Sequence, residues 1–250
     1  MSNNIFFSII IITKSNYKEL LLTLDSVADF NYGTFEVIVI NGSKNEYKVP
    51  DSYGNSFSLS EIYDDGVGIY NAMNLGIEYV KGDYVVFMKA GDLFVSNNIF
   101  SYINSMLKAN SEIDVLYGAA IRTDGSNDSS SIFWPRKPDS LLFGMIACHQ
   151  SIYYRSSLLF KYKFEENNIS NDWKHLLNLY RNGYSLFMTN RIFSLFDTSG
   201  LSSKRFFKAF LEKWKYARQI SQNRLQIDAR FSRKLVRIMR GKFERKFREY

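Results

Sequence analysis

The sequence has too few cysteines for an internal disulfide and too short apolar runs for a membrane span. Cys148 is its only cysteine, which fits a reducing compartment. No uninterrupted apolar stretch approaches the roughly 18–20 residues that a spanning helix needs. Residues 1–13 contain an apolar run but no positive residue before it. We therefore expect a strand there, not a signal peptide.

Charge is distributed unevenly along the chain. The 250 residues carry a formal net charge of +7, with 46% hydrophobic and 23% charged residues, an ordinary globular composition. Residues 204–250 hold 16 Lys and Arg against 4 Asp and Glu, a net +12. Residues 1–203 hold 16 against 21, a net −5. We expect two parts in one chain, the basic one suited to a polyanion such as lipid headgroups or nucleic acid.

Alternating segments of two kinds predict an α/β fold. Residues 6–12 and 35–40 are near-continuous β-branched runs, as in strands buried on both faces. Between them, at 19–28, leucine and valine recur at helical spacing. This βαβ pattern predicts a mostly parallel central sheet flanked by helices, with right-handed crossovers. Further strands are expected at 59–63, 85–88, 114–118, 184–188 and 192–196, and helices at 69–80, 97–109 and from 170–172 onward.

Polar residues follow the predicted buried strands. Thr13 and Asn41 come after the first two, and Asp92 comes after the strand at 85–88, behind two small residues. Ligands of open α/β sheets bind beyond the carboxyl ends of the strands. Asp92 is therefore a candidate to hold a divalent cation that carries a nucleotide diphosphate. The plain alternative is an aspartate of a strand-to-turn junction.

Segments in a fixed order connect these elements to a known family. Residues 68–77 read GIYNAMNLGI, and a GDY sequence at 82–84 leads to AGD at 90–92. His149-Gln150, Asp172-Trp173 and the SGLS sequence at 199–202 follow. Together they resemble the family 2 glycosyltransferases of the GT-A, or nucleotide-diphospho-sugar transferase, fold, and most of all bacterial enzymes that build surface polysaccharides. The resemblance covers about residues 5–202.

The resemblance implies a GT-A catalytic domain over residues 1–203, followed by a helical basic extension over 204–250. Some positions depart from the family pattern. Asn71 stands in place of an aspartate, and Asn41 stands where an aspartate commonly reads the nucleotide base. Gly91 replaces the first carboxylate of the variant DXD motif, which leaves Asp92 alone as the carboxylate ligand.

The implied reaction is inverting transfer of a sugar from a nucleoside-diphosphate sugar, with a UDP-sugar expected by family habit, to a hydroxyl of a glycan or lipid-linked acceptor. Asp172 is the candidate base, resembling the family's catalytic acidic residue. An apolar wall of Trp173 and Phe164 would raise the pKa of its carboxyl group. The alternative for Asp172 is a helix N-cap. A Mg²⁺ or Mn²⁺ ion is expected at Asp92, because these ions prefer oxygen ligands.

The candidate donor-binding residues lie at strand ends and in the motif segments. Thr13, Asn41 and Asp65 are expected to contact the base and ribose, with Asp64 as an alternative to Asp65. Lys89 and His149 are expected near the phosphates. Each also has a plain interpretation as a turn, capping or surface residue. The set is Thr13, Asn41, Asp65, Asn74, Lys89 and His149. His175, the other histidine, lies mid-helix and is expected to be structural.

The basic part is helical by its period. Its apolar stripe is Phe206, Phe207, Phe210, Leu211 and Trp214, with lysines beside it. Such a helix suits an interface with anionic lipid, which would bring the enzyme to a polyprenol-linked acceptor at the cytoplasmic, inner face of the plasma membrane. The alternative is that the stripe packs on the catalytic domain or on a second copy in a homodimer.

Two rival functions remain open at the level of sequence. One is a non-catalytic protein that binds nucleic acid or another polyanion through the basic part. The predicted strands lack interleaved aromatic and basic residues, so no nucleic-acid partner is expected. The other is a degenerate, transferase-like subunit, which would bind a donor without transferring its sugar. It is suggested by Asn41 and by Lys89, which stands where the family usually has Asn or Asp.

Overall fold

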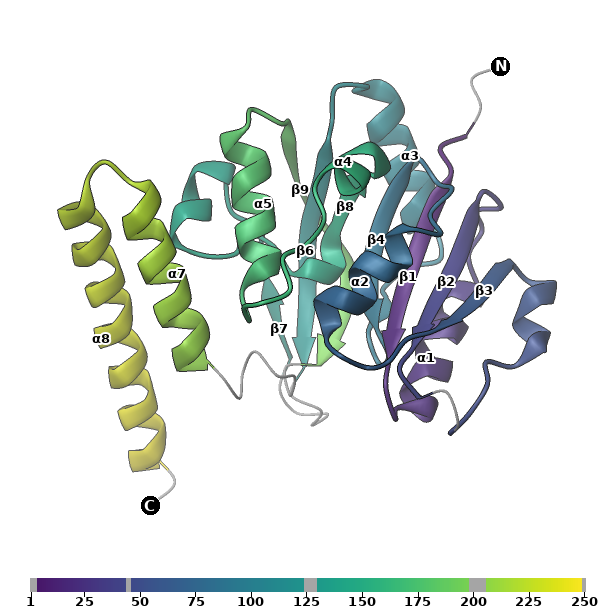
Figure 1. Cartoon of the computed structure of the whole chain (residues 1–250), viewed down its shortest axis with the longest axis horizontal. Helices are drawn as coiled ribbons and strands as arrows, with labels where there is room; N and C mark the ends of the chain where they lie inside the picture. Colours follow the sequence, from purple (N-terminus) through teal and green to yellow (C-terminus); the bar gives the residue numbers. More distant parts are fainter. Residues whose placement is uncertain (1–3, 44–45, 124–129, 198–205, 249–250) are drawn as a thin grey trace.

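The computed structural model describes residues 4–43, 46–123, 130–197 and 206–248. One nine-stranded sheet runs through it in the order β3-β2-β1-β4-β8-β6-β9-β5, and β7 pairs with β6 at the side (Figure 1). The strands are β1 (Phe7–Thr13), β2 (Phe35–Asn41), β3 (Ser58–Tyr63), β4 (Tyr84–Lys89), β5 (Leu93–Phe94), β6 (Val115–Thr123), β7 (Ser130–Phe133), β8 (Ile152–Arg155) and β9 (Leu186–Asp197).

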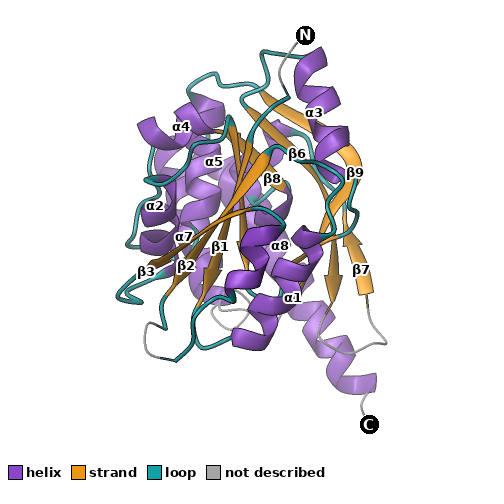
Figure 2. Cartoon of the chain, turned by 90° about the vertical axis from the view of Figure 1, so that its right-hand side faces the viewer, coloured by secondary structure: helices purple, strands orange, loops and turns teal. Residues whose placement is uncertain are grey.

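Helices cover both faces of this sheet (Figure 2). They are α1 (Tyr17–Ala28), α2 (Ile69–Ile77), α3 (Ile99–Ala109), α4 (Ser156–Lys161), α5 (Asn171–Arg181), α7 (Phe206–Ile220) and α8 (Arg224–Arg248). Three short 3-10 helices, η1 (Asp51–Asn55), η2 (Pro138–Phe143) and η3 (His149–Ser151), lie in the connections.

The half of the sheet that contains β1 is parallel. Strands β3, β2, β1 and β4 pair parallel, with Ile10 of β1 opposite Ile38 of β2 and Phe87 of β4. Every residue of β2 is buried, as expected of a β-branched strand covered by helices on both faces. The predicted α/β class and its parallel βαβ core are confirmed.

The other half of the sheet is mixed, which the sequence did not predict. Strand β8 runs antiparallel between β4 and β6, whereas β6 and β9 pair parallel. The two strands expected at 184–188 and 192–196 form one strand, β9, of 12 residues. Its register against β6 shifts near Tyr117 and Ala119. Such an irregularity absorbs the polar residues 189–191 without ending the pairing.

Two separate cores hold the layers together. On one face, α1 and α3 pack Leu24, Phe100 and Ile103 against the sheet. On the other face, α2, α4 and α5 contribute Met73, Leu159 and Leu176 to a second cluster. The extension, helices α7 and α8, forms a hairpin beyond α5 (Figure 1).

The hairpin packs on the rest of the chain through part of its apolar stripe. Phe210 and Ala217 of α7 are buried with Ile227 and Phe231 of α8. Tyr216 of α7 also donates a hydrogen bond to Asn178 Oδ1 of α5, at 2.8 Å. Phe210 of the stripe is therefore buried in this cluster, against which Leu142 and Phe143 also pack, while Phe207 and Leu211 are exposed. Within the described ranges, no helix combines the length and the hydropathy that a membrane crossing requires.

The close approach of α2 to the sheet yields a test of the fold. A Cβ atom on Gly76 would lie 2.7 Å from Ile10 Cγ2 and 3.3 Å from Ile40 Cγ1. Gly76→Ala should lower the free energy of unfolding by about 1–3 kcal/mol, because neither β-branched side chain can move within a packed strand. Urea denaturation measures it. Gly54→Ala is the control, since nothing lies within 4 Å of its Cβ position. Equal stability of the two variants would show that α2 is not tightly seated.

Candidate functional site

The predicted polar residues meet at the carboxyl edge of the parallel strands. Thr13 of β1 lies directly opposite Asn41 of β2, and Lys89 of β4 lies opposite Ile12. The arrowhead of β1 marks this edge at the bottom of Figure 1. Asp92 follows Lys89 by three residues, so the same edge carries the candidate cation ligand.

Asp92 is a buried carboxylate with a fixed direction. Its side chain is part of a residue only 2% exposed. The backbone N–H of Lys89 donates to Oδ2 at 2.7 Å, and the Gln150 side-chain amide donates to the same oxygen at 2.9 Å. Gly91, at φ +96°, makes the tight turn that brings the carboxylate back over the end of β4. Sequence reasoning named Asp92 but missed Gln150 as the side chain that orients it.

The residues around Asp92 fit one kind of metal site. Within the part of the chain that the structure describes, no group of three or more His, Cys, Asp or Glu side chains could hold a metal ion. A complete protein-only cage is thus not formed by these residues. A single hard carboxylate fits Mg²⁺ or Mn²⁺ whose other ligands are substrate phosphates and water.

The turn at residues 148–150 lies near both candidate carboxylates. The Cys148 thiol donates to Gln150 Oε1 at 2.9 Å, and the same glutamine holds Asp92. Burial raises the pKa of the Cys148 thiol, and the negative charges of Asp92 and Asp172 raise it further. Both carboxylates therefore lie close enough to the thiol to act on it, although they are distant in sequence.

Asp172 lies in the first turn of α5. The expected N-cap at Asn171 or Asp172 is wrong: the helix begins one residue earlier, with Ser170 as the N-cap. Asp172 instead accepts a hydrogen bond from the backbone N–H of Trp173 at 2.8 Å. Its negative charge is favoured there by the exposed N–H groups and dipole of the helix N-terminus.

The motif segment at 68–77 contacts the segment that leads into α5. The hydroxyl of Tyr70 donates to Ile169 O at 2.7 Å and lies 3.3 Å from both the backbone nitrogen and Oδ1 of Asp172. Burial and the charge of Asp172 raise the pKa of Tyr70, so its hydroxyl stays protonated. Tyr70 thus positions the candidate base, a role that sequence reasoning missed.

Asn74 makes a second bridge from the same helix. Its side-chain amide donates to Phe164 O at 2.8 Å, and its Oδ1 accepts from Phe164 N at 2.9 Å. Both ends of the amide are occupied by one residue of the protein. This geometry indicates a positioning role for Asn74, and direct donor contact stays a prediction.

Thr13 and Asn41 are held by partners that sequence reasoning missed. Thr13 Oγ1 lies 2.6 Å from the hydroxyl of Tyr47, and Asn41 Nδ2 donates to Glu61 Oε1 at 2.8 Å. Tyr47 also packs against Tyr17, with ring centroids 4.9 Å apart. Tyr17 is 36% exposed, so an aromatic surface lies beside the two strand ends. Contact of Thr13 and Asn41 with a nucleotide base stays a prediction.

The loop of Asp64 and Asp65 lies against the same edge. Asp64 Oδ1 accepts from Gly66 N at 2.9 Å and would lie 2.9 Å from a Cβ atom on Gly42. Asp65 is exposed. Lys89 is half-buried at the end of β4. The nucleotide contacts expected of Asp65 and Lys89 stay predictions, and the motif match at 199–202 falls outside the described residues.

His149 is surrounded by aromatic rings. Its ring centroid lies 5.4 Å from that of Phe87, 5.9 Å from Phe164 and 6.0 Å from Tyr154. Both ring nitrogens are buried without a hydrogen-bond partner among the described residues. Burial lowers the pKa of His149, opposed by the charge of Asp172. The imidazole is therefore neutral near pH 7, and its expected role beside the diphosphate stays a prediction.

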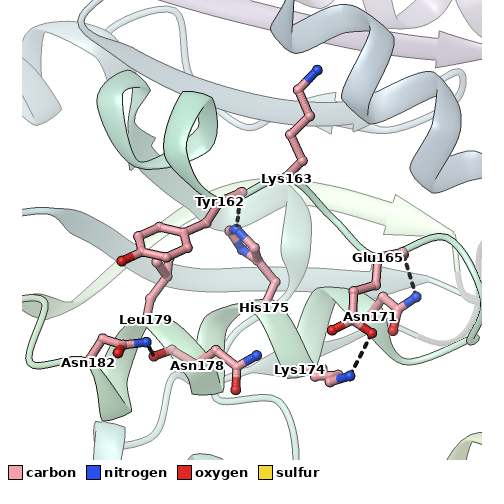
Figure 3. Close-up of a pocket in the computed structure, with 9 residues that line it drawn as sticks. All are labelled: Tyr162, Lys163, Glu165, Asn171, Lys174, His175, Asn178, Leu179 and Asn182. Carbon is pink, nitrogen blue, oxygen red and sulfur yellow. Dashed lines mark hydrogen bonds and ion pairs between the residues drawn. The ribbon is translucent and has the colours of Figure 1, made fainter.

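A separate cavity of about 160 Å³ lies between α5 and residues 162–165 (Figure 3). His175 contributes to its wall and has Nε2 2.8 Å from Tyr162 O. Burial lowers the pKa of His175 to about 4, which agrees with the structural role expected for it. The predicted catalytic, donor-binding and metal residues do not line this cavity, so it is distinct from the strand-end site.

Comparison with known proteins gives a match over most of the chain. Residues 8–168 match the family model described as Glycosyl transferase family 2. A PGL/p-HBAD biosynthesis glycosyltransferase of Mycobacterium tuberculosis (strain ATCC 25177 / H37Ra) is 28% identical over 156 residues, which is 61% of this chain and 60% of that protein. An uncharacterized glycosyltransferase of Rickettsia bellii is 30% identical over 123 residues, 48% of this chain and 17% of that protein. The chain therefore spans less than two thirds of these relatives.

Solved structures show the same fold at low identity. The S. aureus TarS 1–349 structure in complex with UDP has a TM-score of 0.67 at 18% identity, covering 89% of this chain and 68% of that one. The mannosyltransferase PcManGT from Pyrobaculum calidifontis, in complex with GDP-Man and Mn²⁺, has a TM-score of 0.65 at 13% identity, covering 92% and 70%. These similarities confirm the expected GT-A fold.

The bridge made by Asn74 can be tested without knowing any substrate. Asn74→Ala removes two buried hydrogen bonds and leaves the backbone N–H and C=O of Phe164 without partners. We expect a loss of about 2–4 kcal/mol in the free energy of unfolding, measured by urea denaturation. Asn31→Ala removes one long, exposed hydrogen bond between two side-chain amides, at 3.4 Å. It should change the free energy of unfolding by less than about 0.5 kcal/mol. A loss equally small in Asn74→Ala would contradict the bridge.

Proposed function

Because the chain belongs to glycosyl transferase family 2, we propose that it transfers a sugar, with inversion, from a nucleoside-diphosphate sugar to a hydroxyl group. The expected donor is a UDP-sugar, and the expected acceptor is a glycan or a lipid-linked saccharide of surface-polysaccharide synthesis. The supporting observation is that Asp92 and Asp172 both lie near the 148–150 turn, where both act on Cys148 and Gln150 holds Asp92. The Asp92 carboxylate would bind a cation, and the Asp172 carboxylate would accept a proton.

The two carboxylates would divide the chemistry between them. Asp172 accepts the proton of the acceptor hydroxyl while that oxygen forms a bond to C1 of the sugar. The bond from C1 to the diphosphate breaks on the opposite face, and the nucleoside diphosphate leaves. Asp92 would hold Mg²⁺ or Mn²⁺, which when bound neutralises the negative charge of the leaving diphosphate. Tyr70 keeps Asp172 in place, and Gln150 does the same for Asp92.

Thr13, Asn41 and Asp65 are proposed to contact the base and ribose, and Lys89 and His149 to lie near the phosphates. The positions of Thr13 and Asn41, side by side at the strand ends, support this. The TarS and PcManGT structures, which contain UDP and GDP-Man, support a nucleoside diphosphate as the donor. They do not decide between uracil and guanine for this chain.

Substitution of the two carboxylates separates the two roles. Asp172→Asn should keep donor affinity and lower transfer by roughly 100-fold or more, because an amide cannot accept the proton. Asp92→Asn should weaken Mn²⁺-dependent donor binding by about tenfold or more. Titration calorimetry with UDP-sugars and GDP-mannose measures binding, and release of nucleoside diphosphate measures transfer. Asp51→Asn, an exposed carboxylate paired with Lys48, should change neither.

The rival functions give different results in the same assays. Normal turnover in Asp172→Asn would remove the base assignment. Donor binding without transfer by the unaltered chain would identify a degenerate subunit. Salt-sensitive DNA binding without any sugar-nucleotide binding would favour the polyanion-binding protein.

We further propose that the hairpin of α7 and α8 attaches the enzyme to the inner face of the plasma membrane. Leu211, Trp214 and Arg218 of α7 line one groove together with Arg224 of α8. Leu225, next to Arg224, is 83% exposed. Exposed leucines beside cationic side chains suit an anionic lipid surface.

Sedimentation with vesicles tests this attachment. The chain should bind phosphatidylglycerol vesicles and leave phosphatidylcholine vesicles largely unbound. The double variant Leu211→Ser/Leu225→Ser should lower binding by roughly tenfold, because it removes apolar area from the lipid contact. Leu22→Ser is the control, because this leucine on α1 is about as exposed as Leu211. Binding unaffected by the double variant would reject the attachment, and a concentration-dependent dimer lost in the same variant would assign the surface to a homodimer.

A further inference from the structure

Four cationic side chains gather where the hairpin meets the catalytic part. Lys234 of α8 donates to Phe143 O at 3.1 Å. A Cβ atom on Gly144 would lie 3.3 Å from Lys234 Nζ and 3.7 Å from an Arg136 nitrogen, so both cations lie on one side of this glycine. The guanidinium of Arg230 lies 4.5 Å from the ring centroid of Phe143. We call Arg136, Lys213, Arg230 and Lys234 the cationic cluster.

Lys213 joins the cluster from α7. Its Nζ lies 5.9 Å from the ring centroid of Trp173, the residue after Asp172. Burial, followed by the charges of Lys213 and Arg136, lowers the pKa of Lys234 to about 8. The three cations therefore act on one another although they come from three segments of the chain.

No ion pair joins a member of this cluster to a carboxylate of the described residues. The acidic residues of the same helices have other partners: Glu212 accepts from Ile169 N at 3.1 Å, and Asp228 pairs with Arg218 at 3.1 Å. A set of like charges without a counter-charge raises the local positive potential, which attracts an anion.

The position of the cluster indicates which anion it would meet. Gly144, beside the cluster, and Gln150, beside Asp92, are the two ends of one loop. The indole nitrogen of Trp173 donates to Leu141 O of η2 at 2.6 Å, which places the residue after the candidate base against the same segment. The cluster therefore lies where α7 and α8 meet η2, against the segment that Trp173 contacts. The donor diphosphate is expected at the other end of the loop, at Asp92.

We propose that Arg136, Lys213 and Lys234 bind a phosphate or diphosphate group carried by the acceptor. This inference rests on the proposed transferase function and specifies its acceptor as a phosphate ester. Arg136 offers a planar fork of N–H donors, and the lysines add charge-assisted bonds. Binding there would hold the acceptor on the Asp172 side of the site, with its hydroxyl turned toward the candidate base.

Binding of inorganic pyrophosphate and farnesyl diphosphate by the full chain tests the proposal. Both are titrated calorimetrically in EDTA, in an Asp92→Asn background, so that the metal-dependent donor site does not contribute. Lys234→Gln and Arg136→Gln should each weaken binding by about tenfold, the effect of losing one charge-assisted bond. Arg233→Gln removes the same charge from the next position of α8, where Arg233 Nε donates to Ala229 O, and should have no effect.

The two probes identify the source of the phosphate. Tighter binding of farnesyl diphosphate than of pyrophosphate would identify a lipid-linked acceptor, and equal affinities would identify a soluble one. No binding of either probe, or equal losses in Lys234→Gln and Arg233→Gln, would overturn the proposal and show a solvated basic surface. Donor binding, measured separately with Mn²⁺ in the unaltered chain, is independent of this result. Failure of the cluster to bind phosphate is therefore distinguishable from failure of the proposed transferase function.

The pH dependence of pyrophosphate binding gives a second readout. Lys234 faces Lys213 from α7, Arg136 from the segment before η2, and Arg230 from its own helix, with the Phe143 carbonyl as acceptor. Because the pKa of Lys234 is lowered to about 8, its charge should fall between pH 7 and pH 9, and the affinity should fall relative to that of a variant with a permanent positive charge at this position. Lys234→Arg, which stays protonated at pH 9, should keep the affinity and lose this pH dependence. An unchanged pH profile in Lys234→Arg would contradict the assignment.

Discussion

The arrangement of the site depends on how one buried carboxylate is held. Asp92 receives hydrogen bonds from the Lys89 backbone and the Gln150 side chain on the same oxygen. A carboxylate removed from water needs such donors, because its desolvation would otherwise cost several kcal/mol. The donors come from the end of β4 and from η3, so the 148–150 turn must close against the sheet. The position of this turn also brings Cys148 within reach of the charges of both Asp92 and Asp172.

Helix α2 connects distant parts of the site by hydrogen bonds. Tyr70 of α2 holds the start of α5. Asn74, one turn further along α2, holds Phe164. The helix itself is seated at Gly76, where β1 and β2 leave no room for a side chain. A displacement of α2 would therefore move Asp172 relative to Asp92. This coupling gives a physical reason for the GIYNAMNLGI segment that does not require each of its polar residues to touch a substrate.

Sequence patterns predicted the features that depend on local periodicity. The β-branched runs gave β1, β2 and β4, and the alternation with helices gave their parallel pairing, which placed Thr13, Asn41 and Asp92 at one edge. Partners from distant segments were not predictable in this way. Glu61 reaches Asn41 from β3, and Gln150 reaches Asp92 across 58 residues of chain. The cap at Ser170 was also missed, because Ser170, Asn171 and Asp172 are all favourable N-cap residues and only tertiary packing selects among them.

The packing of the α7–α8 hairpin places the basic residues of the extension on two surfaces. The period of α7 predicted one apolar stripe, but periodicity does not specify what covers a stripe. Phe210 and Ala217 are covered by α8, whereas Leu211 is 58% exposed beside cationic residues. Lys213 instead lies over the ring of Trp173, and Lys234 donates to Phe143 O of η2. The basic residues of this part therefore lie on two different surfaces, one open to solvent and one against Trp173 and η2, and a count of basic residues alone cannot separate them.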